Sequence, residues 1–323
     1  MDSKHKIPIV VLNWNKSELT ISLIKNLEEI EGKNLDLRYI IVDNNSKVEE
    51  REKLVKFANR EDVWKILDEN EAESYEDNEN QLNILLLLKD NYGYAKGNNF
   101  GLELAYRLGY KYCVVSNNDV IIEKPVINKL LEILEQSKNI GAIGPKIIGP
   151  RGENQGPFRE PSLYDYFFYP IFYPFIWPIK KVILKNKNNY KNKFPYRLMG
   201  CFLVVDLAVF KKIDWFDENT FLYADELILA EKFKKIGYRM AYEDSVYIKH
   251  LHGVSTEELG NKNRILQQLK SDQYYFKEYR NFGQIKLFLV KVGFLYSNFI
   301  LIPVVKKVKK YFRFLQKSED RSK

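Results

Sequence analysis

The sequence predicts an α/β fold in which helices flank a mostly parallel β-sheet. Short runs of β-branched and aliphatic residues alternate with longer segments whose apolar residues recur at helical spacing. This alternation is typical of parallel sheets, because each parallel strand needs a crossover before the next strand begins. A chain of 323 residues, 45% of them hydrophobic, can bury a full core as one large domain or as a domain with an appendage.

The first two strands are predicted from apolar runs of strand length. Residues 7–12 (IPIVVL) form one run, and the following segment, 19–27, carries leucines every four residues, as one face of a helix does. The unit then repeats, because residues 37–42 have the same strand-like character and the charged segment 49–59 can form a second helix.

The same alternation continues through the rest of the chain. Apolar runs predict four further strands, at residues 82–88, 112–116, 201–205 and 240–248. Helical spacing predicts three further helices, at residues 96–108, 126–134 and 225–237. The pattern breaks after Pro150 into glycine, proline and aromatic residues and resumes near Gly200, so an irregular segment is inserted there.

Two segments have unusual compositions. Residues 68–80 hold seven acids and no base, which predicts an exposed loop before the strand at 82–88. Residues 163–179 hold nine aromatic residues and three prolines, and the prolines argue against a regular membrane-spanning helix there. An acceptor flap near lipid and an ordinary packed subdomain remain alternatives for this aromatic segment.

Charge and cysteine content narrow the classes of protein. The net charge is +8, but residues 306–323 hold eight Lys or Arg against two acids, which leaves only +2 for the remainder. Basicity confined to a tail argues against a nucleic-acid-binding protein and suits an anionic membrane surface. The two cysteines lie in apolar runs, and the amino-terminal apolar run is too short for a signal peptide, so a cytoplasmic protein is expected.

Polar clusters follow four of the predicted strands. In open parallel sheets the ligand lies beyond the carboxyl ends of the strands. One such cluster would be an ordinary turn, whereas four at one edge predict a binding site. The clusters are Asn13 with Asn15, the run Asp43-Asn44-Asn45-Ser46, residues 90–99, and Asn117-Asn118-Asp119.

The cluster residues indicate a nucleotide ligand. Asp43, at a strand end, can accept hydrogen bonds from a base or a ribose, or it can simply cap a turn. A Gly-x-x-x-Gly-x-x-x-Gly series begins at Gly93, and Asn98 and Asn99 lie at the start of the helix that follows, where backbone N–H groups could face a phosphate. This glycine spacing fits neither the dinucleotide fingerprint nor the P-loop, which disfavours NAD and ATP.

Carboxylates supply the remaining chemistry. Asp119 alone could anchor a hard divalent cation, because such a cation keeps waters and takes phosphate oxygens, although a turn cap is the alternative. Asp225 and Glu226 begin a predicted helix, where either could serve as the general base or where both could merely stabilise the helix start. Asp217 and Glu218 are expected to organise the preceding turn.

The order and spacing of eight segments resemble the family 2 glycosyltransferases, and most closely their rhamnosyltransferase-like and capsular-polysaccharide branch. The likeness covers roughly residues 7–256. The segments are VLNWN (11–15), IVDNNS (41–46), DNYGYAKGNNFGLELA (90–105), SNNDV (116–120), IGPKI (143–147), MGCFLVVD (199–206), WFDENTFLYADELILAEKFKKIGY (215–238) and KHLHGVST (249–256).

The resemblance implies a GT-A (Rossmann-like) fold, an inverting transfer and a Mg²⁺ or Mn²⁺ cofactor. The implied metal ligands are Asp119 and His250, with His252 a weaker candidate. Asn117 stands where the first carboxylate of the Asp-x-Asp motif often lies, and the Asp225-Glu226 order inverts the usual Glu-Asp. The implied nucleotide-sugar ligands are Asn13, Asn15, Asp43, Asn45, Gly93, Lys96, Asn98, Asn99 and Asn118.

The predicted function is an inverting glycosyltransferase that moves a sugar from a nucleotide-sugar donor to a lipid-linked saccharide in surface-polysaccharide synthesis. A sugar-nucleotide nucleotidyltransferase is the alternative, but it needs a glycine-rich phosphate loop after the first strand, and VLNWNKSE has no glycine. The predicted domains are a catalytic domain at 1–260, with the acidic loop 68–80 and an acceptor-side aromatic insert at 157–195, and a helical basic segment at 261–323.

The carboxyl-terminal segment is expected to associate with the inner face of the cell membrane. Residues 292–305 are uncharged and contain Pro303, and a span takes about 20 apolar residues, so this segment is too short to cross alone. Crossing, and a helix packed in the core or in a homo-oligomer, remain alternatives. The basic residues expected to contact anionic head groups are Lys306, Lys307, Lys309, Lys310 and Arg313.

Overall fold

The computed structural model describes residues 6–33, 35–60, 62–76, 83–174, 193–251 and 260–308. The chain divides into two compact units. Unit 1 comprises Met1–Arg159 and Lys191–Arg264, and unit 2 comprises Glu160–Tyr190 and Ile265–Lys323. Unit 2 contains most of the segment predicted as the aromatic insert, 157–195, together with most of the predicted carboxyl-terminal segment, 261–323. The predicted domain division stays a prediction.

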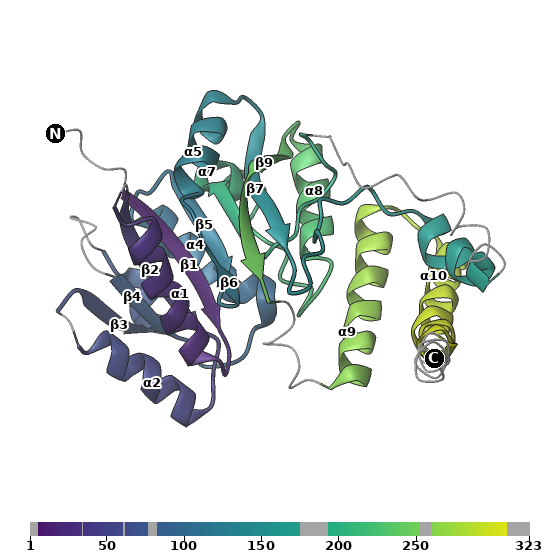
Figure 1. The fold of residues 1–323 in the computed structure, drawn as a ribbon, viewed down its shortest axis with the longest axis horizontal. Helices are drawn as coiled ribbons and strands as arrows, with labels where there is room; N and C mark the ends of the chain where they lie inside the picture. The colour runs from purple at the N-terminus through teal and green to yellow at the C-terminus, as the bar shows by residue number, and fades with distance from the viewer. Residues whose placement is uncertain are drawn as a thin grey trace, which may run out of the picture. The chain divides into compact units, whose positions relative to one another are not determined.

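Unit 1 is built on a nine-stranded mixed sheet in the order β3-β4-β2-β1-β5-β8-β7-β9-β6 (Figure 1). The parallel part consists of β1 (Lys6–Asn13), β2 (Asp36–Asp43), β3 (Trp64–Asp68), β4 (Asn83–Leu87) and β5 (Tyr112–Asn117). The rest consists of β6 (Val120–Ile121), β7 (Ile140–Ile148), β8 (Phe202–Asp206) and β9 (Arg239–His250). β8 runs antiparallel between β5 and β7, and β9 runs parallel to β7, which confirms the predicted α/β class with a mostly parallel sheet.

Helices cover both faces of this sheet (Figure 1). One face packs against α1 (Ser17–Ile30), α2 (Val48–Ala58) and α5 (Ile127–Gln136). The other packs against α3 (Glu69–Ser74), α4 (Gly93–Arg107), α7 (Leu207–Lys212) and α8 (Asp225–Lys235). In β1, Ile9 and Val11 face the first core and Val10 faces the second. A strand buried on both faces needs an unbroken apolar run, which is what residues 7–12 supply.

The acidic segment is partly ordered, so the prediction of a plain loop is wrong in its first half. Asp68 ends β3 and caps α3, because its side chain accepts hydrogen bonds from the backbone N–H groups of Asn70 and Glu71. The Glu71 carboxylate returns a bond to the Asp68 N–H at 2.8 Å. These acids therefore form a capping box, which stabilises a short helix start despite the charge density. Residues 77–82 lie outside the described residues.

The glycine series that begins at Gly93 brings α4 close to the sheet. A Cβ atom at Gly97 would lie 2.6 Å from Leu12 Cδ1, and one at Gly101 would lie 2.6 Å from Val10 Cγ1. Both distances are shorter than van der Waals contact. At Gly101 the close neighbour is the stiff, buried Val10, so a larger residue would push the helix off β1, whereas at Gly97 the Leu12 side chain would have to move. The second and third glycines of the series, Gly97 and Gly101, therefore serve helix packing.

Unit 2 holds the carboxyl-terminal helices. They are α9 (Asn261–Tyr274), which crosses the unit boundary, a π-helical turn at Tyr275–Tyr279, and α10 (Gln284–Tyr296). A π-helical turn at Ser297–Leu301 extends α10, so that helix Gln284–Val308 is continuous over 25 residues. The aromatic insert contributes a π-helical turn at Tyr164–Phe168.

The length argument for the carboxyl-terminal segment is therefore wrong. Helix Gln284–Val308 is long and apolar enough to cross a membrane by length and composition. Lys286 and Lys291 lie within it and do not interrupt it. Pro303 does not end it either, because the wider π-helical turn just before the proline can accommodate a residue without an N–H donor. Lys309, Lys310 and Arg313 lie outside the described residues.

Candidate active site

A buried polar network lies beneath the carboxyl edge of β1 and β2. Asp43 is fully buried, and its carboxylate accepts hydrogen bonds from Asn13 Nδ2 at 3.0 Å, Arg51 Nε at 2.8 Å and Ser46 N at 3.3 Å. These contacts let Asp43 position Arg51 and the loop that follows β2. A direct contact of Asp43 with a base or ribose stays a prediction.

Arg51 was not predicted from the sequence. It comes from α2, and its guanidinium also donates to Leu88 O at 2.8 Å and to Asn45 Oδ1 at 3.4 Å. Asn45 is exposed and adopts a left-handed backbone conformation, with φ of 56°. Arg51 and Asn45 therefore form the accessible rim of this network, and Asn45 as a nucleotide ligand stays a prediction. The sequence signal for Arg51 was its place in the first turn of the helix that follows the loop beginning at Asp43.

Asn13, Asn15 and Asn118 belong to the same network. Asn13 Oδ1 accepts from Thr20 Oγ1 at 2.8 Å, and Asn118 Nδ2 donates to the same Thr20 hydroxyl at 3.1 Å. Asn15 has a φ of 54° and accepts a bond from the backbone N–H of Lys47 at 2.7 Å. These three residues are brought together as predicted. Their amide groups mainly fix the loops that surround the ligand edge.

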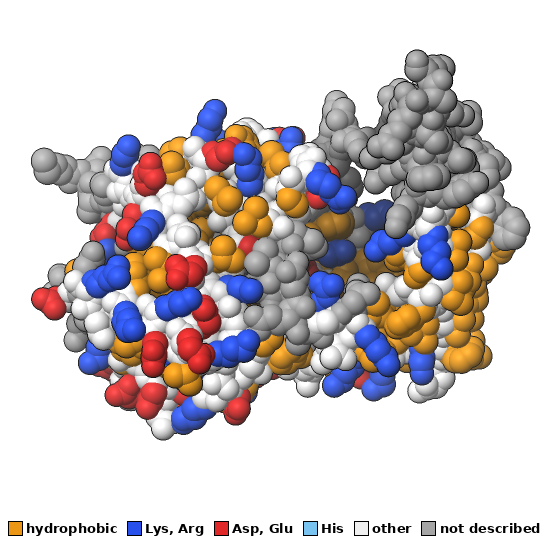
Figure 2. Space-filling view, turned by 60° about the horizontal axis from the view of Figure 1, so that its bottom comes forward, with side chains coloured by type: hydrophobic (Ala, Val, Ile, Leu, Met, Phe, Trp, Pro, Cys, Tyr) orange, Lys and Arg blue, Asp and Glu red, His pale blue; other side chains and the backbone are white. Residues whose placement is uncertain are grey.

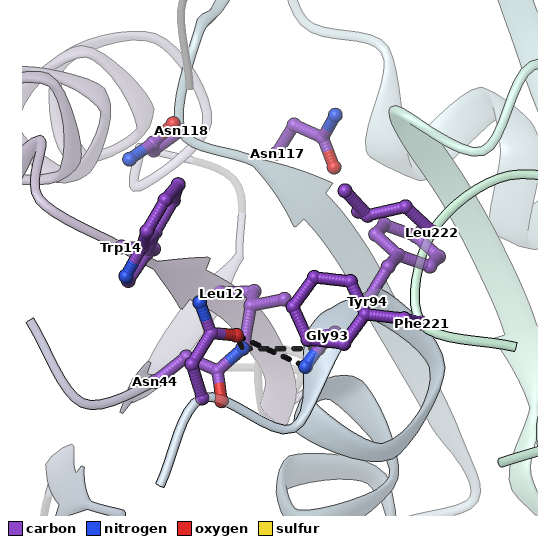
Figure 3. Close-up of a pocket in the computed structure, with 10 residues that line it drawn as sticks. Leu12, Trp14, Asn44, Gly93, Tyr94, Asn117, Asn118, Phe221 and Leu222 are labelled. Atoms are coloured by element: carbon purple, nitrogen blue, oxygen red, sulfur yellow. Dashed lines mark hydrogen bonds between the residues drawn. The ribbon is translucent and has the colours of Figure 1, made fainter. Parts of the chain in front are cut away.

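A pocket opens at this edge (Figure 3). Asn44 stabilises the floor of the pocket through three hydrogen bonds. Its Nδ2 donates to Asn91 Oδ1 at 2.9 Å and to Gly93 O at 3.0 Å. Its Oδ1 accepts from Tyr92 N at 2.9 Å. The described residues that line the pocket are aromatic, aliphatic, amide or glycine, and none is charged. They are Leu12, Trp14, Asn44, Asn91, Gly93, Tyr94, Asn117, Asn118, Phe221 and Leu222.

Trp14 lies on one side of this cavity, and Tyr94 and Phe221 lie on the other (Figure 3). The cavity volume is about 110 Å³. Two aromatic walls and neutral amides suit a planar or sugar ring and not a phosphate. Sequence reasoning singled out only Gly93 and Asn118 as ligands in this lining. The aromatic lining residues lie inside the segments 11–15, 90–105 and 215–238, and the sequence predicted no role for them.

The first turn of α4 holds the loop that leads to α8. Gly93 has φ of +80°, and the backbone N–H of Tyr94 donates to Phe221 O at 2.8 Å. Tyr223 and Ala224 then both adopt left-handed conformations, with φ of 69° and 63°. Two consecutive non-glycine residues of this kind are strained and persist only where their surroundings fix them. This strained stretch leads directly into Asp225 at the start of α8.

The remaining predicted residues of α4 have structural contacts. Asn98 Nδ2 donates to Tyr94 O at 2.9 Å within the helix. Asn99 pairs with the backbone of Phe216 in both directions, each at 3.0 Å. These contacts give the two side chains a structural role, and Asn98 and Asn99 as nucleotide-sugar ligands stay a prediction. Lys96 is 3.4 Å from a carboxylate oxygen of Glu218, and its role as a ligand stays a prediction.

Asp225 and Glu226 lie at the start of α8 in different surroundings. Asp225 is buried, and its Oδ1 accepts from Thr220 Oγ1 at 3.0 Å. Burial, with the charge of Glu226 adding to it, raises the pKa of Asp225 well above its usual range. Glu226 is half-buried, and its Oε1 accepts from Gly200 N at 3.0 Å. The two carboxyl groups are therefore not equivalent, and burial disfavours the charged form of Asp225.

Tyr94 connects the pocket to Glu226 through the peptide groups on either side of Gly200. The Tyr94 hydroxyl donates to Gly200 O at 2.7 Å, while the N–H of Gly200 donates to Glu226. Gly200 lies close to both partners, since an added Cβ would be 3.0 Å from the Tyr94 hydroxyl and 3.1 Å from Glu226 Oε1. One wall of the pocket is thus tied, through one residue, to a carboxylate of α8.

Asp119 and His250 are adjacent because β6 pairs antiparallel with the end of β9, where Val120 lies opposite His250. His250 Nε2 is 3.2 Å from Asp119 Oδ1, and both side chains are buried. On the other side of the ring, His250 Nδ1 is 2.7 Å from Gln155 Oε1, and Gln155 Nε2 donates to His250 O at 3.4 Å. An amide oxygen only accepts, so Nδ1 carries a proton.

This arrangement fits a cation. In a neutral ring with a proton on Nδ1, Nε2 carries a lone pair, and two acceptor atoms 3.2 Å apart need a proton or a cation between them. Gln155 was not predicted, and it acts as the second partner that orients the imidazole. Within the described ranges there is no group of three His, Cys, Asp or Glu residues that could hold a metal ion. His252 lies outside those ranges.

The Asp119–His250 pair and the Asp225–Glu226 pair lie at the same edge of the sheet. Burial raises the pKa of the Cys201 thiol, and the nearby charges of Asp119 and Glu226 raise it further. Cys201 thus lies close to both carboxylates, and its carbonyl accepts from Asn117 N at 2.9 Å. Asp217 accepts from Asn219 N at 2.9 Å, which confirms its predicted role in the turn.

Comparison with known proteins yields a partial sequence match. No protein-family model matches the chain. The chain is 28% identical over 149 residues to the N-acetylglucosaminyl-diphospho-decaprenol L-rhamnosyltransferase of Mycobacterium tuberculosis. The match covers 45% of this chain and 48% of that protein, so the chain spans about half the length of the curated relatives it matches.

Solved structures share the fold at low sequence identity. The structure of GalNAc-T7 with UDP, GalNAc and Mn²⁺ has a TM-score of 0.56 at 10% identity, covering 87% of this chain and 50% of that one. A mannosyltransferase from Pyrobaculum calidifontis with GDP-Man and Mn²⁺ has a TM-score of 0.53 at 12% identity, covering 90% and 74%. These likenesses confirm the GT-A fold that the motifs implied.

Proposed function

We propose that this chain, which has the GT-A fold of family 2 glycosyltransferases, transfers a sugar from a nucleotide-sugar donor to a lipid-linked saccharide with inversion. The observation that carries the proposal is the meeting of the Asp119–His250 pair and the Asp225–Glu226 pair at one sheet edge, beside an aromatic pocket. The name of the mycobacterial relative specifies a lipid diphosphate acceptor, and the two solved structures contain UDP or GDP-Man. A role in surface-polysaccharide synthesis completes the proposal.

Asp119 and His250 are the residues that would hold Mg²⁺ or Mn²⁺. The solved neighbours contain Mn²⁺, which supports a divalent cation here. A bound cation would neutralise charge on the diphosphate of the donor. With only two protein ligands, most of the coordination shell would be left to phosphate and water, as is common for such cations. Gln155 keeps the imidazole oriented for this task through its contact with Nδ1.

Glu226 is the general base in this proposal. Its carboxylate is half-buried, oriented by the Gly200 N–H, and keeps a second oxygen for an acceptor hydroxyl. As that hydroxyl oxygen attacks the anomeric carbon, its proton passes to Glu226 and the bond to the nucleoside diphosphate breaks, which inverts the configuration. Asp225, buried and bonded to Thr220, orients the helix start and does not accept the proton.

Attachment to the cytoplasmic face of the membrane is the proposed location. Helix Gln284–Val308 carries the exposed residues Lys286 and Lys291 near its first end, and Lys306 and Lys307 near its last. A single crossing would place one of these basic groups on each side of the membrane, against the preference of Lys for the cytoplasmic side. A helix that lies along an anionic surface keeps all four lysines in contact with head groups.

The test of the proposed function is a donor screen with the full chain. UDP-, dTDP- and GDP-sugars are incubated with and without Mn²⁺, and release of the nucleoside diphosphate is measured. We expect slow, Mn²⁺-dependent hydrolysis of one donor class, accelerated by a saccharide acceptor on a polyprenyl diphosphate. Formation of a nucleotide sugar from a sugar phosphate and a nucleoside triphosphate would instead establish the nucleotidyltransferase.

Replacement of Tyr94 by phenylalanine tests how the base is positioned. The variant loses the hydroxyl that holds Gly200 O, and we expect kcat to fall about tenfold while the KM for the donor stays near the wild-type value. Tyr106→Phe removes a hydroxyl from the same helix at an exposed position and is the matched control. Equal kinetics for the two variants would remove Tyr94 from the positioning of Glu226.

A further inference from the structure

Asp119 directly precedes a short strand at one border of the sheet. β6 is two residues long, and in the described sheet its one neighbour is β9. This pairing holds one side of the segment, because Val120 lies opposite His250. The backbone N–H of Leu251 also donates to Asp119 O at 3.0 Å. An edge strand of this length makes few hydrogen bonds within the sheet, so its position depends on further contacts.

A side chain of α1 holds the chain immediately after β6. Asn26 Nδ2 donates to Ile122 O at 2.9 Å, and Asn26 Oδ1 accepts from Ile122 N at 2.8 Å. One amide group thus pairs with both backbone groups of one residue, which is the exchange that two hydrogen-bonded strand residues make. Ile122 is buried, so its N–H and C=O need protein partners. This pair of bonds is the Asn26 clamp.

Helix α1 fixes the segment on both sides of Asp119. On the amino-terminal side, Asn118 Nδ2 donates to the Thr20 hydroxyl of α1 at 3.1 Å. On the carboxyl-terminal side lies the Asn26 clamp. Further on, Glu31 at the end of α1 accepts from two backbone N–H groups at the start of α5, at 2.5 and 3.1 Å. Because α1 is packed in the first core, these contacts leave the segment that carries Asp119 little freedom to shift.

Another contact of this segment lies on the surface. Glu123, which follows Ile122, accepts from Lys249 Nζ of β9 at 2.5 Å. The Glu123 and Lys249 side chains are both exposed. Exposed ion pairs contribute little to stability and are screened by salt, so this pair is a weak constraint on the segment. The contacts to α1 therefore contribute most to its position.

We propose that Asn26 is a positioning residue for the divalent cation, and that the Asn26 clamp keeps the Asp119 carboxylate beside His250 Nε2. Asp119 and His250 are the two ligands that the described residues offer, so a shift of one is not compensated by another. Mg²⁺ in particular demands near-ideal octahedral geometry. This role of Asn26 rests on the proposed function, which assigns a cation to this pair.

A role in stability alone makes a different prediction. Loss of the clamp leaves two buried backbone groups without their partner, which lowers the free energy of unfolding. A positioning role also lowers the affinity for Mn²⁺, while nucleotide binding without metal stays unchanged. Asn83→Leu is the matched control for Asn26→Leu. Asn83 is also half-buried, its Oδ1 accepts from Tyr39 N at 3.0 Å, and it begins β4, at the end of that strand away from the ligand edge.

The experiment titrates the full chain with Mn²⁺ in the presence of UDP, dTDP or GDP, and measures free Mn²⁺ by electron paramagnetic resonance. We expect Asn26→Leu to bind Mn²⁺ about tenfold more weakly than the wild type, and Asn83→Leu to bind it normally. Nucleotide binding in EDTA should be equal in all three proteins. Acidic and basic side chains are interspersed on the face of unit 1 that Figure 2 shows (left), so a background of weak surface binding is expected, and Asp119→Ala measures it.

Equal Mn²⁺ affinity of folded Asn26→Leu and Asn83→Leu would overturn the positioning role. An equal loss of nucleotide affinity in EDTA would also overturn it, because the nucleotide site and not the cation would then be affected. If Asn26→Leu does not fold, Asn26→Asp replaces it. A carboxylate still accepts from Ile122 N but cannot donate to Ile122 O, so we expect a smaller loss, and wild-type affinity would contradict the role. Wild-type Mn²⁺ binding no stronger than that of Asp119→Ala would instead remove the cation from the proposed function, and the role of Asn26 with it.

Discussion

Replacement of Glu226 by glutamine is expected to reduce sugar transfer by at least about 100-fold while donor affinity stays near the wild-type value. Glutamine keeps the shape of the side chain and can still accept from the Gly200 N–H, but it cannot take a proton from an acceptor hydroxyl. A loss of this size corresponds to about 2.7 kcal/mol of transition-state stabilisation. Single-turnover transfer and calorimetric binding of the nucleoside diphosphate separate the two quantities.

Asp225→Asn is the matched control for this experiment. The carboxyl group is buried, its pKa is raised, and Thr220 donates to it, so an asparagine resembles its neutral form and keeps the contact. We expect transfer to fall less than about tenfold in this variant. A large loss in Asp225→Asn with a near-normal Glu226→Gln would exchange the two roles. Normal transfer by both variants would leave the acids with only the task of stabilising the start of α8.

Replacement of Asp119 by alanine is expected to abolish the dependence of nucleotide binding on a divalent cation. A diphosphate and a carboxylate repel each other unless a cation lies between them, and His250 alone is a weak site for Mg²⁺ or Mn²⁺. Titration calorimetry with UDP, dTDP and GDP, with Mn²⁺ or with EDTA, measures the effect. We expect at least about a tenfold loss of affinity in the presence of Mn²⁺, and none in EDTA.

Glu123→Ala provides the control for that prediction. Glu123 is a nearby acid, but it is exposed and its carboxylate accepts from Lys249 Nζ at 2.5 Å and from Tyr247 at 3.1 Å. Its removal should leave nucleotide binding unchanged. Two results would contradict the role of Asp119 as a metal ligand. One is wild-type nucleotide binding that does not change when EDTA is added. The other is an Asp119→Ala variant that retains Mn²⁺-dependent nucleotide binding and turnover.

Several strands of unit 1 were predictable because a strand buried on both faces needs a continuous apolar run, which is visible in the sequence. The runs at 7–12, 37–42 and 112–116 are continuously apolar, and each became a strand of the parallel part. β3 and α3 escaped prediction, since a five-residue strand and a six-residue helix lie in a charged stretch where no period can be recognised. The helix Gln284–Val308 was underestimated because charged residues and a proline were taken as its limits.

The sequence by itself determined which segments become strands and helices, and that polar residues collect at one sheet edge, because periodicity and strand ends are local properties of the chain. It also marked Asp119, His250 and the two acids of α8 as candidates. Which groups stay open to a ligand was decided only by the tertiary structure. Pairing of β6 with β9 places Asp119 beside His250, and packing of α2 places Arg51 in hydrogen-bond contact with Asp43.

The same holds for the two acids of α8. They are neighbours in sequence and of similar chemistry, so no local pattern can separate them. The contact of Thr220 with Asp225, and the contact of Glu226 with a glycine that Tyr94 holds, depend on three segments meeting in space. Desolvation and hydrogen bonding act over distances of a few ångströms in the folded protein, whatever the separation along the chain. These effects distinguish the buried Asp225 carboxyl, whose pKa is raised, from the half-buried Glu226 carboxyl.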